Sequence, residues 1–184
     1  MQKCKHFREI IRAQSGKPVL IMITPDFILN LLEEVSDPEI PVLTINDLGI
    51  VRGVEILSDD EVNITITPTY SGCPAMDAIA FDIKMKLIAN GIKKTNIIYS
   101  ISPPWNTDWM TEEGKRKLKS YGIAPPQNIS SRMEKMLFEE ETDIECPRCH
   151  SRNTKLLSQF GSTACKALYQ CNECKEPFDY FKCH

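Results

Sequence analysis

CPRC at residues 146–149 and CNEC at residues 171–174 decide the fold of the C-terminal part of this chain. A C-x2-C pair places two sulphurs on one tight turn, and two such pairs can close a tetrahedron of thiolates around Zn²⁺. Residues 150–170 between the pairs are long enough for short antiparallel strands, with a turn at 161–162. So small a segment buries little apolar surface, so a bound metal would supply much of its stability. We predict a zinc ribbon at 143–184.

The predicted metal ligands are Cys146, Cys149, Cys171 and Cys174. Four thiolates leave no open coordination position, which indicates a structural rather than a catalytic ion. A rubredoxin-like mononuclear iron site uses the same ligands, and a nucleic-acid-binding ribbon is a further alternative, although the lysines of this segment are scattered. His150 next to a ligand is interpreted as a surface or supporting residue. Substitute ligands, should one knuckle cysteine be displaced, would be Cys165, Cys183 and His184.

Composition narrows the class of protein. The chain has 184 residues, 42% of them hydrophobic and 26% charged, which is ordinary for a globular protein. A net charge of −3 and a pI near 5.7 argue against a broad electrostatic grip on nucleic acid. No apolar run approaches the length that spans a membrane, and no export signal is recognisable. The eight cysteines therefore predict a reducing, cytoplasmic location, with metal or thiol chemistry rather than a disulfide framework.

Residues 24–126 predict an α+β domain in which helices cover one face of a small mixed sheet. Thr24 and Pro25 are typical of a helix start, and apolar residues continue at helical spacing to residue 35. Alternating apolar residues predict a hairpin of two strands. The remaining elements follow from the same signals, and the full set is a helix at 25–35, strands at 50–57 and 62–67, a helix from Pro74 to Gly91, a strand at 95–101 and a helix at 111–121.

The two remaining segments have no clear period. Residues 1–23 carry mixed charge and are interpreted as an N-terminal extension. Residues 127–142 turn acidic towards their end and are interpreted as a solvated linker between the α+β domain and the ribbon.

Cys73 is the thiol with the most interesting surroundings. It follows Gly72, which permits close approach of a ligand or partner backbone, and it precedes a helix that begins at Pro74. Unpaired backbone N–H groups and the helix dipole favour a thiolate there, whereas Asp77 one turn along opposes it. A cysteine that simply packs is an equally good interpretation. A cysteine protease is a poor one, because every histidine lies in the end segments.

The short motifs resemble a known family. DPEIP at 37–41, DLG at 47–49 and GCP at 72–74 are similar to the iron–sulphur cluster assembly domain family. Three further stretches narrow the resemblance to the PaaD-like subunits of the phenylacetyl-CoA epoxidase system, which serves aerobic phenylacetate degradation: WNTDWMTEEG at 105–114, GIAPP at 122–126, and FGST with CKAL at 160–168. The resemblance covers 24–184, and the order of the motifs is more specific than any one of them.

The resemblance implies roles for several residues. Cys73 would contact iron or an iron–sulphur cluster transiently. Asp37 and Glu39 would shape the pocket near it, although a plain helix stop and turn explains Asp37 as well. Asp47 would cap or orient the same loop, and Gly72 would support it. One thiolate cannot complete a cluster's usual four-cysteine shell.

The resemblance also implies an accessory, non-catalytic subunit. Its client would be the reductase, an iron–sulphur flavoprotein, and the oxygenase subunits are further candidate partners. Nucleic acid and membranes are not expected partners, and a homodimer stays open. Two other functions compete: a zinc-ribbon adaptor that docks epoxidase subunits without handling iron, and a thiol or redox protein that uses Cys73.

Overall fold

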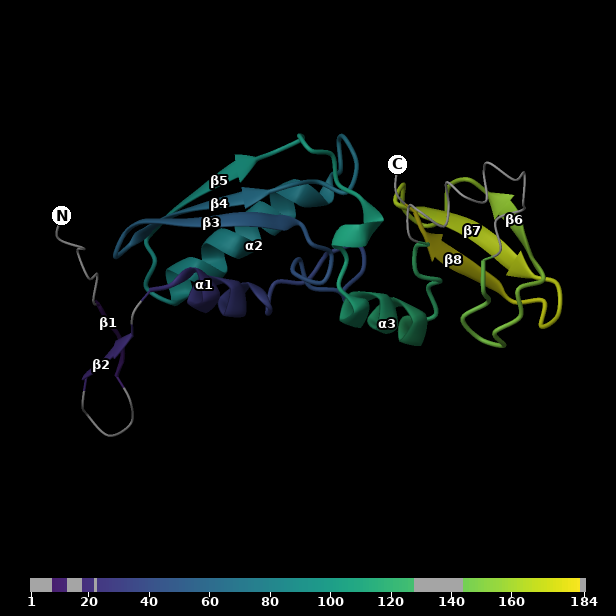
Figure 1. Cartoon of the computed structure of the whole chain (residues 1–184), viewed down its shortest axis with the longest axis horizontal. Helices are drawn as coiled ribbons and strands as arrows, with labels where there is room; N and C mark the ends of the chain where they lie inside the picture. The colour runs from purple at the N-terminus through teal and green to yellow at the C-terminus, as the bar shows by residue number, and fades with distance from the viewer. Residues whose placement is uncertain (1–7, 13–17, 22, 128–143, 183–184) are drawn as a thin grey trace.

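The computed structural model describes residues 8–12, 18–21, 23–127 and 144–182. Most of the predicted acidic linker at 127–142 therefore lies outside the described residues, as do Cys183 and His184. The described chain forms a sheet with two helices and a separate three-stranded ribbon, and a third helix lies between them (Figure 1).

The sheet of the main domain is mixed, as predicted. Its strands β3 (Val51–Ser58), β4 (Glu61–Ile66) and β5 (Lys94–Tyr99) are hydrogen-bonded in the order β3-β4-β5. β3 and β4 form the predicted antiparallel hairpin, whereas β5 is parallel to β4. A parallel pair needs a crossover connection, which the helix α2 (Ala75–Ala89) supplies.

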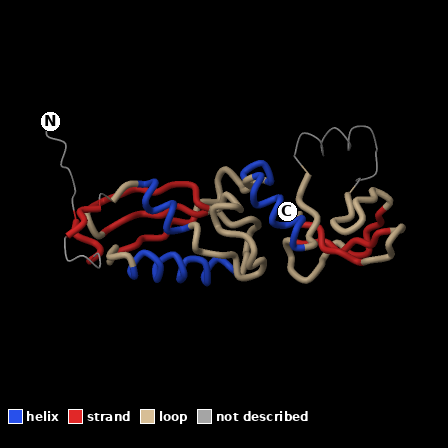
Figure 2. Tube along the Cα trace, turned by 90° about the horizontal axis from the view of Figure 1, so that it is seen from below, coloured by secondary structure: helices blue, strands red, loops and turns tan. Residues whose placement is uncertain are grey.

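Alternation along β4 decides which face of the sheet is buried. Val62, Ile64 and Ile66 are 0% exposed, and the residues between them point to the opposite face. There Asn96 Nδ2 donates to Asn63 Oδ1 at 3.0 Å on the neighbouring strand. The helices cover the apolar face, as predicted, which is seen most clearly in Figure 2.

The helix α1 (Pro25–Leu32) begins as predicted and ends earlier. Thr24 caps it, because its Oγ1 accepts a hydrogen bond from the Phe27 N–H at 3.1 Å. After Leu32 the chain turns: the Val35 carbonyl accepts from the Ile45 N–H at 3.0 Å instead of continuing the helix. The predicted end at residue 35 was wrong because Val35 is buried at helical spacing without being helical.

Two strands lie within the predicted N-terminal extension. β1 (Arg8–Arg12) and β2 (Pro18–Ile21) pair antiparallel. Runs of four or five residues are too short for the period to identify a strand, which explains why the sequence pattern did not predict them.

The C-terminal residues form the predicted ribbon. Its strands β6 (Thr154–Ser158), β7 (Lys166–Cys171) and β8 (Pro177–Phe181) pair antiparallel in that order. Tyr169 stacks on Phe178 and meets Tyr180 edge-on, with ring centroids 6.0 and 5.6 Å apart. These rings form a core that is small for an independently folded unit.

The ribbon packs directly on the main domain. Ala124, just after α3 (Glu112–Tyr121), donates its N–H to the Asp179 carbonyl at 2.8 Å and accepts from the Phe181 N–H at 3.0 Å. The Phe181 ring meets Trp105 edge-on, with centroids 6.0 Å apart. Phe181 and Cys165 are therefore ribbon residues within the hydrophobic core of the main domain.

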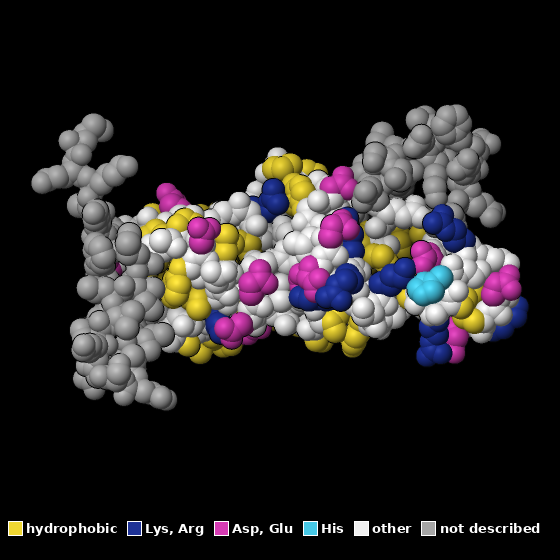
Figure 3. Space-filling view, turned by 60° about the horizontal axis from the view of Figure 1, so that its bottom comes forward, with side chains coloured by type: hydrophobic (Ala, Val, Ile, Leu, Met, Phe, Trp, Pro, Cys, Tyr) yellow, Lys and Arg dark blue, Asp and Glu magenta, His cyan; other side chains and the backbone are white. Residues whose placement is uncertain are grey.

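The surface carries charges of both signs. On the face drawn in Figure 3, basic and acidic side chains are interspersed rather than gathered by sign. Across the described residues, we find no helix with the length and apolar character needed to cross a bilayer.

Candidate functional site

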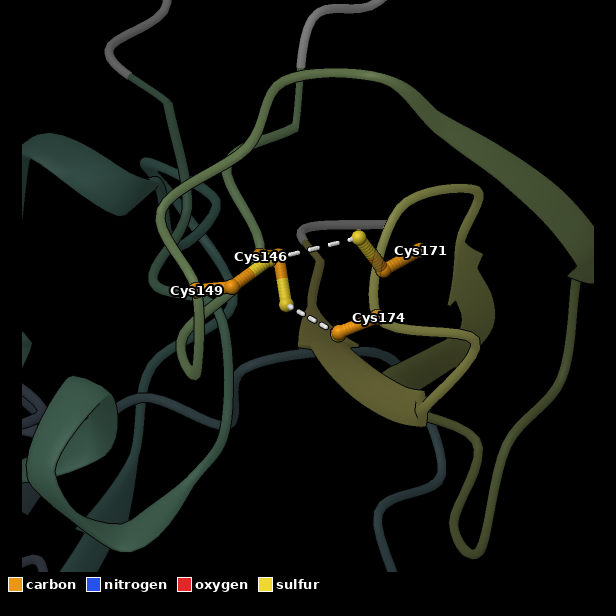
Figure 4. Close-up of side chains that lie close together, drawn as sticks. All are labelled: Cys146, Cys149, Cys171 and Cys174. Carbon is orange, nitrogen blue, oxygen red and sulfur yellow. Dashed lines mark hydrogen bonds between the residues drawn. The ribbon is translucent and has the colours of Figure 1, made fainter.

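The cysteine pairs of the ribbon lie on two turns whose side chains face each other (Figure 4). The sulphurs of Cys146, Cys149, Cys171 and Cys174 all lie within 4.8 Å of one another. The Cys146–Cys174 pair is 3.8 Å apart and the Cys149–Cys171 pair 3.5 Å. A Zn–S distance of about 2.3 Å sets the sulphurs of a tetrahedron about 3.8 Å apart. The four side chains therefore fit one metal ion, and their chemistry suits zinc.

The two turns share one backbone form. His150 and Lys175, which follow the second cysteine of each pair, have φ of 62° and 65°. Their N–H groups donate to the carbonyls of Cys146 and Cys171 at 3.0 and 3.1 Å. His150 itself is exposed, and its Nδ1 lies 2.8 Å from Glu145 Oε1, so it is a surface residue beside the metal centre.

Cys73 lies directly before α2, on the loop that leaves β4. Gly72 has φ of +81°, and no atom lies within 4 Å of the point where a Cβ would stand. The left-handed backbone conformation accounts for glycine here, and the open space beside it leaves the predicted approach of a ligand or partner backbone as a prediction. The Cys73 thiol is half-buried and packs against the edge of the hydrophobic core.

The net effect on the pKa of the Cys73 thiol differs from the prediction. Burial raises the pKa of the Cys73 thiol above its ordinary value, although the Ala75 N–H at the start of α2 lowers it. The charges of Glu39 and Asp37 raise this pKa further, so these two carboxylates oppose the thiolate. The helix end acts as predicted, but burial outweighs it.

Tyr70 is a member of this site that the sequence did not identify. Its hydroxyl hydrogen-bonds the Cys73 sulphur, and burial together with the negative charges of Cys73 and Glu39 raises the pKa of Tyr70 to about 12. Tyr70 therefore keeps its proton at neutral pH and can donate a hydrogen bond to a thiolate. One feature of the sequence could have identified Tyr70 as a site residue: it lies three residues before Cys73, on a loop that turns at Gly72.

The charges of Asp37 and Glu39 act on the Cys73 thiol, and the pocket role that the resemblance implies for them stays a prediction. Asp37 Oδ1 accepts from the N–H groups of Glu39 and Ile40, both at 2.8 Å, so Asp37 forms the turn that the simpler interpretation assigns to it. Burial raises the pKa of Asp37 even though these two N–H groups lower it. The turn directs Glu39 towards the ribbon.

Cys165 of the ribbon lies beside Glu39 of the main domain. We expected it as a substitute ligand in the ribbon, but its Sγ lies 3.4 Å from Glu39 Oε2 and 3.0 Å from Thr163 Oγ1. It is 4% exposed. Burial raises the pKa of Cys165 to about 12 despite the Thr163 hydroxyl, and the bond to Glu39 adds to the rise. A thiol of the ribbon thus contacts Glu39 of the main domain.

Asp47 does not support this loop, contrary to the prediction. Its carboxylate accepts from the Thr44 N–H at 3.0 Å, the Thr111 hydroxyl at 3.2 Å and Lys117 Nζ at 2.6 Å. Asp47 therefore anchors the start and the exposed face of α3. Although burial opposes it, the Lys117 ammonium holds the pKa of Asp47 below its ordinary value.

Asp47→Asn should lower stability in a pH-dependent way. Because the pKa of Asp47 is lower in the folded state, its charge stabilises the fold above the unfolded value of 3.8 and ceases to do so as the pH falls through the folded value. We expect a loss of about 1–3 kcal/mol at neutral pH that shrinks below pH 3.8. Urea unfolding of both proteins across this range measures it, with Asp82→Asn on the exposed face of α2 as the matched control. A difference that is constant with pH would contradict the assignment.

Comparison with known proteins matches both parts of the chain. Residues 25–97 match the family model described as iron-sulfur cluster assembly protein, and residues 130–182 match the PaaD zinc beta ribbon domain. A protein of Escherichia coli (strain K12) that is named as a 1,2-phenylacetyl-CoA epoxidase subunit is 48% identical over 153 residues, which cover 83% of this chain and 89% of that one.

Two further relatives match the main domain. An Fe-S protein maturation auxiliary factor of Porphyromonas gingivalis (strain ATCC BAA-308 / W83) is 40% identical over 96 residues, covering 52% of this chain and 90% of that one. The crystal structure of a DUF59 domain from Bacillus anthracis shares 30% identity over 51% of this chain and 90% of that chain, with a TM-score of 0.48. The identity over most of both chains in the Escherichia coli comparison, together with the two family models that this chain matches, shows that this chain belongs to the PaaD family of phenylacetyl-CoA epoxidase subunits.

Proposed function

We propose that this chain is a non-catalytic accessory factor of the phenylacetyl-CoA epoxidase system that assists iron–sulphur cluster assembly or repair in the reductase component. Cys73 is the contact for iron or for the cluster. The ribbon cysteines hold a structural zinc ion. This ion links the two C-x2-C turns and takes no part in the handling of iron.

One observation carries the proposal. In a domain whose relatives are named for Fe-S protein maturation, the structure gives Cys73 a hydrogen-bond donor in Tyr70 and two carboxylates nearby, Asp37 and Glu39. A raised thiol pKa suits transient metal contact, because a metal ion displaces the proton that the free thiol keeps. The same raised pKa argues against the thiol-enzyme alternative, since a nucleophilic cysteine needs a thiolate at neutral pH.

Cys73→Ala should lower the cluster content of the reductase several-fold when the two proteins are produced together. The substitution removes the sulphur and leaves the start of α2 and the ribbon intact. Iron and acid-labile sulphide per reductase chain measure the effect, and Cys4→Ala, outside the described residues, is the matched thiol control. An unchanged cluster content with Cys73→Ala would overturn the proposal.

The adaptor alternative is supported by a different feature. Leu156, Leu157 and Phe160 of the ribbon are large apolar side chains with 42%, 48% and 64% exposure. An adaptor that uses this surface predicts that Phe160→Ser abolishes co-purification with the epoxidase subunits while Cys73→Ala leaves both co-purification and cluster content unchanged. Such a point change is preferable to deleting 143–184, because removal of the ribbon would also withdraw Phe181 from the main-domain core.

A further inference from the structure

The helix α2 is apolar on two of its faces. Its inner face is buried in the core of the main domain. On its outer face, Phe81, Met85 and Ile88 follow one another at helical spacing and are 62%, 49% and 49% exposed. A helix at the surface of a domain normally carries polar residues on its outer face, so this apolar stripe indicates a docking surface. Two exposed charged side chains, Asp77 and Lys84, border the stripe.

The strand that follows α2 leaves one edge of the sheet open. Among the residues that the structure describes, β5 pairs with β4 on one side and with no strand on the other (Figure 1). The N–H groups of Lys94 and Ser100 donate towards β4, both at 2.9 Å. Because backbone groups alternate between the two sides of a strand, those of Thr95, Ile97 and Tyr99 point to the open edge.

The two outer strands of this sheet differ in how they are protected. The pairing of β3 shifts register between Val51 and Gly53 and again between Ile56 and Ser58, and such bulges disfavour pairing with another chain. β5 runs along β4 without a register shift and contains no proline, and its charged residue, Lys94, stands at its start. Edge strands normally carry some protection of this kind, so the regular edge of β5 indicates a partner strand.

The charges beside the stripe suit a second copy of this chain as the partner. A twofold interface joins one patch to itself, so the patch must be complementary to itself. Asp77 and Lys84 are opposite in sign and lie about two turns apart, on either side of Phe81 along the helix. When two α2 helices pack antiparallel about a twofold axis near Phe81, Asp77 of each copy meets Lys84 of the other. A partner of another kind would not need this arrangement.

One twofold axis can serve the helix and the strand together. α2 ends at Ala89, and after a short turn β5 begins at Lys94 and runs back along the helix. Phe81 stands eight residues before the end of α2, which is about 12 Å at the helical rise per residue. Ile97 stands three residues after the start of β5, which is about 10 Å at the rise of a strand. Phe81 and Ile97 therefore lie at nearly the same level.

We propose that this chain forms a twofold homodimer through α2 and β5. The two β5 strands pair antiparallel about Ile97, which joins the two sheets into one, and the α2 helices pack through their apolar stripes. Cys73 stands eight residues before Phe81, so the antiparallel helices separate the two Cys73 residues by about 24 Å along their axes. Each copy therefore works with its own thiol. The dimer does not depend on the proposed function.

Sedimentation of the full, zinc-loaded chain over a range of concentrations tests the dimer. We expect a species of twice the 21.0 kDa of one chain. Phe81→Ser should weaken dimerisation at least roughly tenfold, because a central apolar residue is lost twice in each dimer. Phe160→Ser is the matched control, since Phe160 is 64% exposed on the ribbon, and it should dimerise as the wild type does.

Two results of this experiment would overturn the inference: a wild type that stays monomeric, or a Phe81→Ser variant that dimerises like the wild type. A monomeric wild type whose co-purification with the epoxidase subunits is lost in Phe81→Ser would assign the face to a different protein. Normal reductase cluster content has no bearing on either result, so the dimer and the proposed function fail separately.

Charge reversal tests the pairing of the helices. Asp77→Lys and Lys84→Asp should each weaken the homodimer at least roughly tenfold, because like charges then face each other at two places. An equal mixture of the two variants should form a heterodimer about as stable as the wild-type dimer, since each opposite pair is restored. Thermal unfolding shows that both variants keep their fold. A mixture that does not recover would contradict this pairing.

Hydrogen exchange tests the pairing of the strands. The N–H groups of Thr95, Ile97 and Tyr99 should be protected in the concentrated wild type and should exchange at least roughly tenfold faster in Phe81→Ser, where the edge is open. Those of Lys94 and Ser100 already bond within one chain and should change less. Equal exchange at the first three positions in both proteins would exclude β5 from the interface.

Discussion

Removing the metal from the ribbon should unfold it and loosen the main domain as well. Zinc binding contributes about 10–16 kcal/mol in small structural sites, as much as or more than the about 5–15 kcal/mol that holds a whole domain. The aromatic core of Tyr169, Phe178 and Tyr180 is too small to replace it. Because Phe181 and Cys165 leave the main-domain core with the ribbon, we expect chelation to lower the main domain's stability too.

Stepwise chelation, followed by tryptophan fluorescence and by alkylation of Cys165, measures this effect. Cys165 should become reactive together with zinc release. Cys171→Ser should reproduce the chelated state at once, and Cys4→Ser, which removes a cysteine that is not one of the four metal ligands, should not. A ribbon that stays folded and docked without metal would contradict the structural role of the four cysteines.

The elements predicted correctly are those with a local signal. The Thr24 hydroxyl caps α1, alternation along β4 selects the buried face, and each C-x2-C pair places two sulphurs on one turn (Figure 4). In each case the deciding residues are near one another in the sequence. Val35 is buried at helical spacing but is not helical, so the spacing of apolar residues alone extended the predicted helix too far.

The composition of the thiol site could not be predicted in the same way. Glu39 and Cys165 are 126 residues apart, and their contact depends on how the ribbon packs. Asp47 was assigned to the wrong loop for the same reason, because its partner Lys117 comes from a helix 70 residues later. The pKa of Cys73 also depends on burial, which the order of residues around a helix start does not reveal.

Trp105→Ala should separate the ribbon from the main domain and destabilise the chain strongly. Trp105 is 4% exposed, its indole N–H donates to the Leu48 carbonyl at 2.8 Å, and its ring meets Phe181 edge-on. Truncating a buried tryptophan costs about 3–5 kcal/mol, and the Leu48 carbonyl loses this donor as well. Trp105→Phe keeps most of the packing and should cost less, chiefly through the lost hydrogen bond. Urea unfolding measures both.

Trp109→Ala is the matched control. Trp109 is half-buried and stacks under the Arg52 guanidinium at 3.6 Å, an interaction worth about 0.5–1 kcal/mol at an exposed site. We expect a smaller loss of stability there and no change at the ribbon. Trp105→Ala should in addition raise the alkylation rate of Cys165, because Phe181 and Cys165 enter the core together. If both tryptophan variants left Cys165 equally protected, Trp105 would not be what holds the ribbon against the Cys73 site.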